Sequence, residues 1–305
     1  MSAGGGGARA IIAALGANAG IAVAKFAGFI VTGSSSMLAE SVHSLADTVN
    51  QGLLLLGRRT STRRATKAHP FGFGRERFLY GFVVALLLFT LGAVFALYEG
   101  VHKVADPHPL EDPLVAVLIL VLAMGLEAFS FRTAISESRE HKGDGSWWRF
   151  IRDAKIPELP LVLAEDSGAL IGLVFALSGV VLSELTGDPV WDGIGTLAIG
   201  TLLGVIALTL IVEMKSLLIG EGADPETLAV INEELVRGRV TRVIHIRTQY
   251  IAPDELLVAA KIALVPSLPL REVATAIDDA EARVRARVPL AKLIYLEPDL
   301  DRNPV

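Results

Sequence analysis

Four polar side chains recur along one apolar segment at about residues 35–56: Glu40, His43, Asp47 and Asn50. Their spacings of three, four and three residues place them on one face of a helix. An imidazole and a carboxylate one helical turn apart can bind the same divalent metal ion. The alternative for an isolated pair such as His43 and Asp47 is a hydrogen bond between helices without any metal.

Two adjacent carboxylates, Glu165 and Asp166, lie in another apolar segment at about residues 159–182. Two carboxylates at membrane depth are strongly unfavourable unless a cation or protons neutralise them. A metal ion shared by the two segments would neutralise both sets of acidic groups. Because the chain has no cysteine, such an ion must be bound by His, Asp and Glu.

Two further charged residues lie in apolar segments and give weaker signals. Glu127 is close in sequence to Arg132, so we interpret it as one half of an ion pair at a helix end more readily than as a ligand. Lys25 could extend its ammonium group to the membrane surface or pair with a carboxylate.

The elements that carry these residues are predicted from hydropathy. Apolar residues make up 52% of the 305 residues and the mean hydropathy is +0.52, too apolar for a soluble protein of this length. Several segments reach the roughly 20 residues that a helix needs to cross a bilayer. We predict an α-helical membrane protein with six transmembrane helices, at about residues 10–31, 35–56, 78–98, 114–131, 159–182 and 190–212.

Charge distribution predicts the orientation of these helices. Basic residues concentrate at about residues 58–77 and 132–155, between predicted helices two and three and between four and five. The positive-inside rule then places both termini in the cytoplasm. The net charge of −5 gives no indication of nucleic-acid binding, since most basic residues serve topology.

The chain divides into a six-helix transmembrane domain, residues 1–219, and a cytoplasmic C-terminal domain, residues 220–305. The second domain alternates helical and strand patterns in the order αββαβ, which predicts a small α+β sandwich. Its segments are expected at about residues 225–237, 240–250, 256–264, 270–287 and 292–296.

Several motifs together resemble the cation diffusion facilitator family over nearly the whole chain. They are His43-Ser-Leu-Ala-Asp47, the loop motif His69-Pro-Phe-Gly-Phe-Gly74 and the αββαβ domain. Residues 39–51 and 157–166 are most similar to the branch that contains zinc transporter nine. The resemblance implies a homodimer, alternating access and metal/proton antiport out of the cytoplasm. It also implies that the C-terminal domain is metallochaperone-like, or ferredoxin-like.

The resemblance also implies which residues hold the metal. His43 and Asp47 match the ligands of the second helix, and Asp166 matches the second member of the pair in the fifth. Val162 stands where the family usually has His or Asp, so Glu165, Asn50 or water is left to supply the fourth ligand.

Other family positions differ as well. Phe73 replaces a His that is often found in the basic loop, and His245 is the only His of the C-terminal domain. We therefore expect no well-formed cytoplasmic metal cluster.

The predicted function is transport of a divalent transition metal, with protons driving its release because ligands must be deprotonated to hold metal. Zn²⁺ is the first choice because three protein ligands leave an exchangeable fourth position. Mn²⁺, Fe²⁺, Co²⁺ and Ni²⁺, or a membrane metal sensor, are the alternatives.

The sequence has no H-E-x-x-H motif and no glycine-rich phosphate loop, so we expect neither an enzyme nor a resident cofactor. The expected partners are metal ions, protons, lipid and a second copy, without nucleic acid, and the expected location is a bacterial inner membrane.

Overall fold

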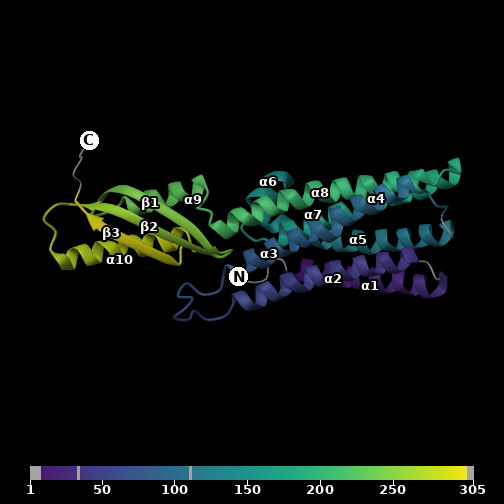
Figure 1. Cartoon of the computed structure of the whole chain (residues 1–305). Helices are drawn as coiled ribbons and strands as arrows, with labels where there is room; N and C mark the ends of the chain where they lie inside the picture. The colour runs from purple at the N-terminus through teal and green to yellow at the C-terminus, as the bar shows by residue number, and fades with distance from the viewer. Residues whose placement is uncertain (1–7, 33–34, 110–111, 301–305) are drawn as a thin grey trace. The chain divides into compact units, whose positions relative to one another are not determined.

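The computed structural model describes residues 8–32, 35–109 and 112–300 (Figure 1). Within these ranges some side chains, including those of Glu40 and His43, fall outside the described residues. The chain forms two compact units. One comprises Met1–Thr62 with Glu76–Lys215, and the other comprises Arg63–Arg75 with Ser216–Val305.

The first unit is helical. Its elements are α1 (Ala8–Thr32), α2 (Ser35–Ser61), α3 (Glu76–Leu87), the π-helix η1 (Leu88–Val94), α4 (Phe95–Ala105), α5 (Pro113–Lys142), α6 (Trp147–Asp153), α7 (Glu158–Thr186) and most of α8 (Val190–Ile219). The elements α3, η1 and α4 follow one another without a break and together form one helical rod.

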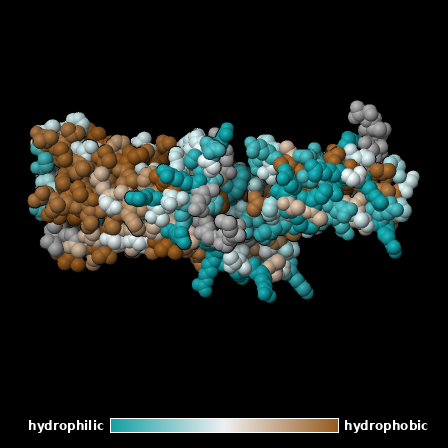
Figure 2. Space-filling view, turned by 180° about the vertical axis from the view of Figure 1, so that it is seen from behind, coloured by the Kyte–Doolittle hydropathy of each residue, from teal (hydrophilic) through white to brown (hydrophobic). Residues whose placement is uncertain are grey.

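Among the described residues, five helical segments are long and apolar enough to cross a membrane: Ala8–Ala27, Glu76–Ala105, Pro113–Arg139, Glu158–Thr186 and Val190–Ile219. The helix α2 is not one of the five, so the sixth predicted crossing is not established. The reason is the composition of α2. The polar residues that make this helix a candidate metal site also lower its hydropathy. Apolar side chains dominate the outer surface of the helical unit in Figure 2, as expected for a protein surrounded by lipid.

Helix packing brings the charged helices together. The helix α1 packs against α2 and α5, and α5 packs against α7. Small residues allow α7 and α8 to approach closely, because a Cβ atom at Gly168 would lie 2.8 Å from Cδ1 of Ile206. The polar residues of α2, α5 and α7 therefore face one common interior.

The second unit contains α9 (Pro225–Leu235), β1 (Val240–Ala252), β2 (Glu255–Leu264), α10 (Leu270–Arg287) and β3 (Leu293–Asp299), in that order (Figure 1). The strand order is β1-β2-β3, with β1 antiparallel and β3 parallel to β2. Alternate residues of β2, among them Val258 and Ile262, are buried, and Ala280 and Val284 of α10 are buried as well. The core of this unit thus consists of apolar residues that recur every two positions in the strand β2 and every four positions in the helix α10.

The basic loop between α2 and α3, Arg63–Arg75, belongs to this second unit. It lies against the β1–β2 hairpin so closely that a Cβ atom at Gly74 would be 2.8 Å from the carbonyl oxygen of Ile251 and would clash with Ala252. This contact joins segments far apart in the chain, so local sequence patterns do not predict it.

Candidate metal transport site

Two neighbouring carboxylates of α7 connect this helix to two different helices. Successive residues of a helix point about 100° apart, so Glu165 and Asp166 face different neighbours. Nε2 of Gln51 on α2 donates to Oε2 of Glu165 at 2.6 Å. Oγ of Ser130 on α5 donates to Oδ2 of Asp166 at 2.7 Å. The pair therefore joins α2, α5 and α7 around one interior region.

Four carboxylates share this region: Asp47, Glu127, Glu165 and Asp166, which we call the acidic cluster. Glu165 interacts electrostatically with each of the other three. The side chains of Glu127, Glu165 and Asp166 are only 6%, 8% and 1% exposed. Buried like charges repel one another strongly, so this region is built to receive positive charge.

Two buried oxygens on the hydrogen-bonded side chains of Gln51 and Glu165 lack donors among the described residues. Among the described residues, Oε1 of Gln51 and Oε1 of Glu165 have no hydrogen-bond partner. Buried acceptors are normally satisfied, and each unsatisfied one costs about 1–3 kcal/mol. A cation between α2 and α7 would satisfy both oxygens at once.

The residues proposed from sequence occupy different places. Asp47 and Asp166 both interact electrostatically with Glu165 in the acidic cluster, and Asn50 is buried on α2. His43 lies in α2, but its side chain is outside the described residues. In the part of the chain that the structure describes, no three His, Asp or Glu side chains converge tightly enough to form a complete set of ligands.

The fully buried Val162 adds an apolar surface to α7 one turn before Glu165 and Asp166. Its side chain supplies no ligand. Glu165, which accepts a hydrogen bond from Gln51 of α2, interacts electrostatically with Asp47.

Sequence reasoning missed two polar residues of this region, Gln51 and Ser130, and it assigned Glu127 a different role. Gln51 follows Asp47 by four residues and Ser130 follows Glu127 by three, so both were available from helical periodicity. Glu127 is buried and interacts with Asp166, Asp47 and Lys25, in contrast to the expected helix-end pair with Arg132.

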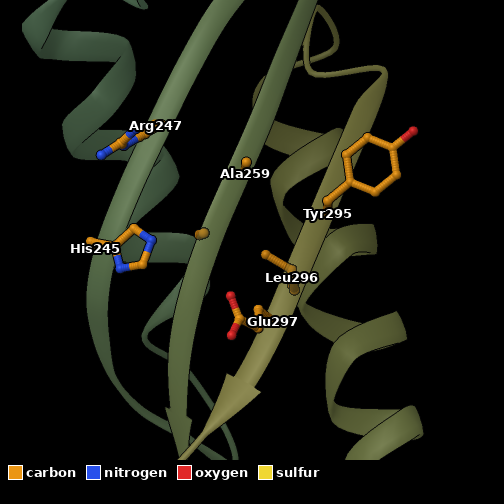
Figure 3. A pocket seen from close by; sticks show the side chains of 7 residues that line it. His245, Arg247, Ala259, Tyr295, Leu296 and Glu297 are labelled. Atoms are coloured by element: carbon orange, nitrogen blue, oxygen red, sulfur yellow. The ribbon is translucent and has the colours of Figure 1, made fainter.

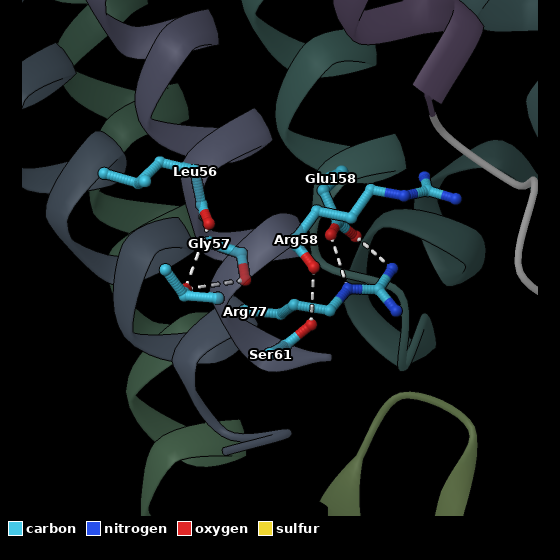
Figure 4. Close-up of polar contacts among 7 residues, drawn as sticks. Leu56, Gly57, Arg58, Ser61, Arg77 and Glu158 are labelled. Atoms are coloured by element: carbon cyan, nitrogen blue, oxygen red, sulfur yellow. Dashed lines mark hydrogen bonds and ion pairs between the residues drawn. The ribbon is translucent and has the colours of Figure 1, made fainter. Parts of the chain in front are cut away.

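A different carboxylate of α7 has a cation of its own. Arg77 at the start of α3 donates from Nε and Nη2 to Glu158 at 2.5 and 2.8 Å, as Figure 4 shows. Glu158 is 1% exposed. This bidentate geometry is the strongest form of the interaction and ties the beginnings of the two helices together.

The C-terminal unit presents a shallow pocket of about 240 Å³ on its sheet. Figure 3 shows His245 and Arg247 on β1 and Tyr295 and Glu297 on β3, with β2 and its Ala259 between the two strands. One imidazole and one carboxylate on different strands are too few ligands for a strong metal site.

Comparison with known proteins identifies the class of this chain. Residues 11–219 match the family model of the cation efflux transmembrane domain. The chain belongs to this family of cation efflux transporters, the cation diffusion facilitators, and such proteins are transporters and not enzymes.

Individual relatives narrow the resemblance to the branch expected from the motifs. The chain is 34% identical over 223 residues to the human proton-coupled zinc antiporter SLC30A9, mitochondrial, which covers 72% of this chain and 39% of that protein. It is 31% identical over 227 residues to metal tolerance protein C4 of Arabidopsis thaliana, covering 73% of this chain and 49% of that protein. A solved MamM C-terminal domain in a nickel form is 16% identical and covers 26% of this chain and all of its own, with a TM-score of 0.25.

The comparisons correct one expectation. The SLC30A9 relatives from four species are all named as mitochondrial, and this finding contradicts the bacterial inner membrane that we expected. This chain spans about two fifths of the length of those relatives.

Proposed function

We propose that the chain carries a divalent transition metal ion, Zn²⁺ in the first place, across the membrane in exchange for protons. The name of SLC30A9 as a proton-coupled zinc antiporter supports this choice, as does membership of the cation efflux family. The proposed path runs between α2, α5 and α7. In this proposal α2 is the sixth membrane-spanning helix.

The observation that carries the proposal is the pair of unsatisfied oxygens within the acidic cluster. Oε1 of Gln51 and Oε1 of Glu165 have no donor among the described residues, while three further carboxylates repel Glu165. A carboxylate that served structure alone would have a donor or cation for each of its buried oxygens. A cation that comes and goes explains why Glu165 has a donor for Oε2 and none, among the described residues, for Oε1.

We propose Asp47, Glu165 and Asp166 as oxygen ligands, with His43 supplying a nitrogen ligand and Asn50 available to complete the set. The hydrogen bonds from Gln51 and Ser130 fix one oxygen of each α7 carboxylate and leave the other oxygen for the metal. Partners of this kind orient ligands and tune their affinity.

Proton exchange follows from charge balance in the same region. Metal binding requires the ligands to be deprotonated, so the departing metal must be replaced by protons for the buried carboxylates to stay neutralised. Two positive charges leave with the metal, and a comparable charge in protons must enter. The transport cycle is therefore a metal/proton antiport.

The test is Zn²⁺ flux into sealed proteoliposomes under an imposed pH gradient, with an interior pH dye. We expect the lumen to become more alkaline as metal enters, and flux to increase when the lumen starts out acidic. A flux that ignores the gradient would overturn antiport. Binding without any flux would favour a metal sensor, the second candidate.

A further inference from the structure

A lysine lies buried among the helices that form the acidic cluster. Lys25 of α1 belongs to a predicted membrane span and is only 8% exposed. Its Nζ donates to Oγ of Ser44 on α2 at 3.1 Å. An ionisable group at membrane depth marks function by default. A lysine that merely extended to the membrane surface would keep its ammonium group exposed.

The position of Lys25 links it to the carboxylates. The helix α1 packs on both α2 and α5, which carry Asp47 and Glu127. Glu127 interacts electrostatically with Lys25, and also with Asp166 and Asp47. Glu127 thus feels both the ammonium group and two of the proposed ligands.

We propose that Lys25 is the resident cation of the acidic cluster, which sets the net charge that an incoming metal ion meets. This inference rests on the proposed function. One fixed positive charge that interacts with Glu127 makes the cluster less negative and weakens its attraction for a divalent ion. Transport requires binding strong enough to capture the ion and weak enough to release it. Lys25 therefore favours release.

Two possible roles of Lys25, one through its charge and one through its hydrogen bond to Ser44, predict opposite changes in metal affinity when the ammonium group is removed. If Lys25 served only to hold Ser44, removing its ammonium group would loosen the packing of α1 on α2 and weaken metal binding. If it acts through its charge, the same change makes the cluster more negative and tightens metal binding. Tighter binding after loss of a polar contact has no structural explanation.

The experiment measures equilibrium Zn²⁺ binding to the purified full-length protein in detergent. Lys25→Met should lower the Kd about tenfold, the scale of one charge removed from a partly buried cluster. Lys25→Arg keeps the charge and should stay within roughly twofold of wild type. Ser44→Ala removes the hydrogen bond and keeps the charge, so it should not tighten binding. If Lys25→Met does not fold, Lys25→Gln replaces it with the same expected shift.

An unchanged or higher Kd in the folded, charge-free variant overturns the role of Lys25. A wild-type protein that binds no Zn²⁺ instead overturns the proposed function, so the two failures are distinguishable. In proteoliposomes the charge-free variant should also release metal more slowly than wild type. Release at the wild-type rate would contradict the inference.

Discussion

The beginning of α7 and the region two turns later handle buried carboxylates in opposite ways. Glu158 has a bidentate partner in Arg77. Glu165, seven residues on, receives its hydrogen bond from the neutral amide of Gln51, and Asp166 receives one from the neutral hydroxyl of Ser130. Both regions are almost fully buried.

The difference separates structural charge from charge kept for an ion. A permanent cation beside a buried carboxylate satisfies it in every state of the protein, as Arg77 does for Glu158. Neutral donors orient a carboxylate and leave most of its charge uncompensated. In the proposed function, the chain therefore keeps Glu158 of α7 for folding, and Glu165 and Asp166 for a cation that moves.

The largest effect is expected from breaking the structural pair. Arg77→Met leaves Glu158 buried without its cation and should lower the free energy of unfolding by about 3 kcal/mol, the low end for a broken buried pair. Thermal unfolding of the purified protein measures this. The double variant Arg77→Met/Glu158→Leu should recover most of the loss. If the double variant stays as unstable as the single one, the pair is not the cause.

The second prediction concerns the carboxylates kept for the ion. Asp166→Asn preserves shape and removes charge, so it should reduce Zn²⁺ flux by at least about 100-fold, beyond the 10- to 100-fold typical of outer partners. Thermal stability should not fall, because a repulsive charge has gone. Wild-type flux in this variant would remove Asp166 from the site. Asp47→Ala should likewise abolish flux.

A smaller effect is expected at Gln51, which orients Glu165. Gln51→Leu removes the donor and should slow flux by roughly tenfold. Thr48 on the same helix donates to a backbone oxygen of α2, so Thr48→Val is a matched control with an expected loss below about twofold. Equal effects of the two variants would show that Gln51 acts only through helix stability.

The smallest effect lies in the C-terminal unit, at the N-terminus of α9. Partial burial alone would raise the pKa of Asp224, but hydrogen bonds from the backbone N–H and hydroxyl of Thr227 hold it below its usual value. Asp224→Ala should destabilise α9 by about 1 kcal/mol, seen as faster amide hydrogen exchange.

The pH dependence of this cap follows from the sign of the shift. Because the folded pKa is depressed, the stabilisation is present above the unfolded pKa of about 3.9 and is lost as the pH falls towards the folded pKa. Relative to the intrinsic exchange rate at each pH, acid should therefore lower the protection of the amides of wild-type α9 and leave that of Asp224→Ala little changed. Parallel acid responses of the two proteins would refute this assignment.

Local periodicity accounts for what the sequence predicted well. The helix α10 (Leu270–Arg287) agrees with the helix expected at about residues 270–287, where apolar residues recur every three to four positions. Loop Arg63–Arg75 escaped prediction because its contact with Ala252 is long-range. Glu127 was assigned to the nearest basic residue in sequence, Arg132, although its charged neighbours come from α1, α2 and α7. Helical periodicity in the sequence predicts which face of a helix a residue occupies. The packing of the helices decides which charged or polar residue becomes its partner.

The most direct test of the account is calorimetric titration of Zn²⁺ into the full-length protein in two buffers of different ionisation enthalpy. The difference between the two titrations gives the protons released for each metal bound. We predict proton release by the wild type, and no Zn²⁺ binding by the double variant Glu165→Gln/Asp166→Asn. Binding without proton release, or binding that survives in the double variant, would contradict metal/proton exchange at the acidic cluster.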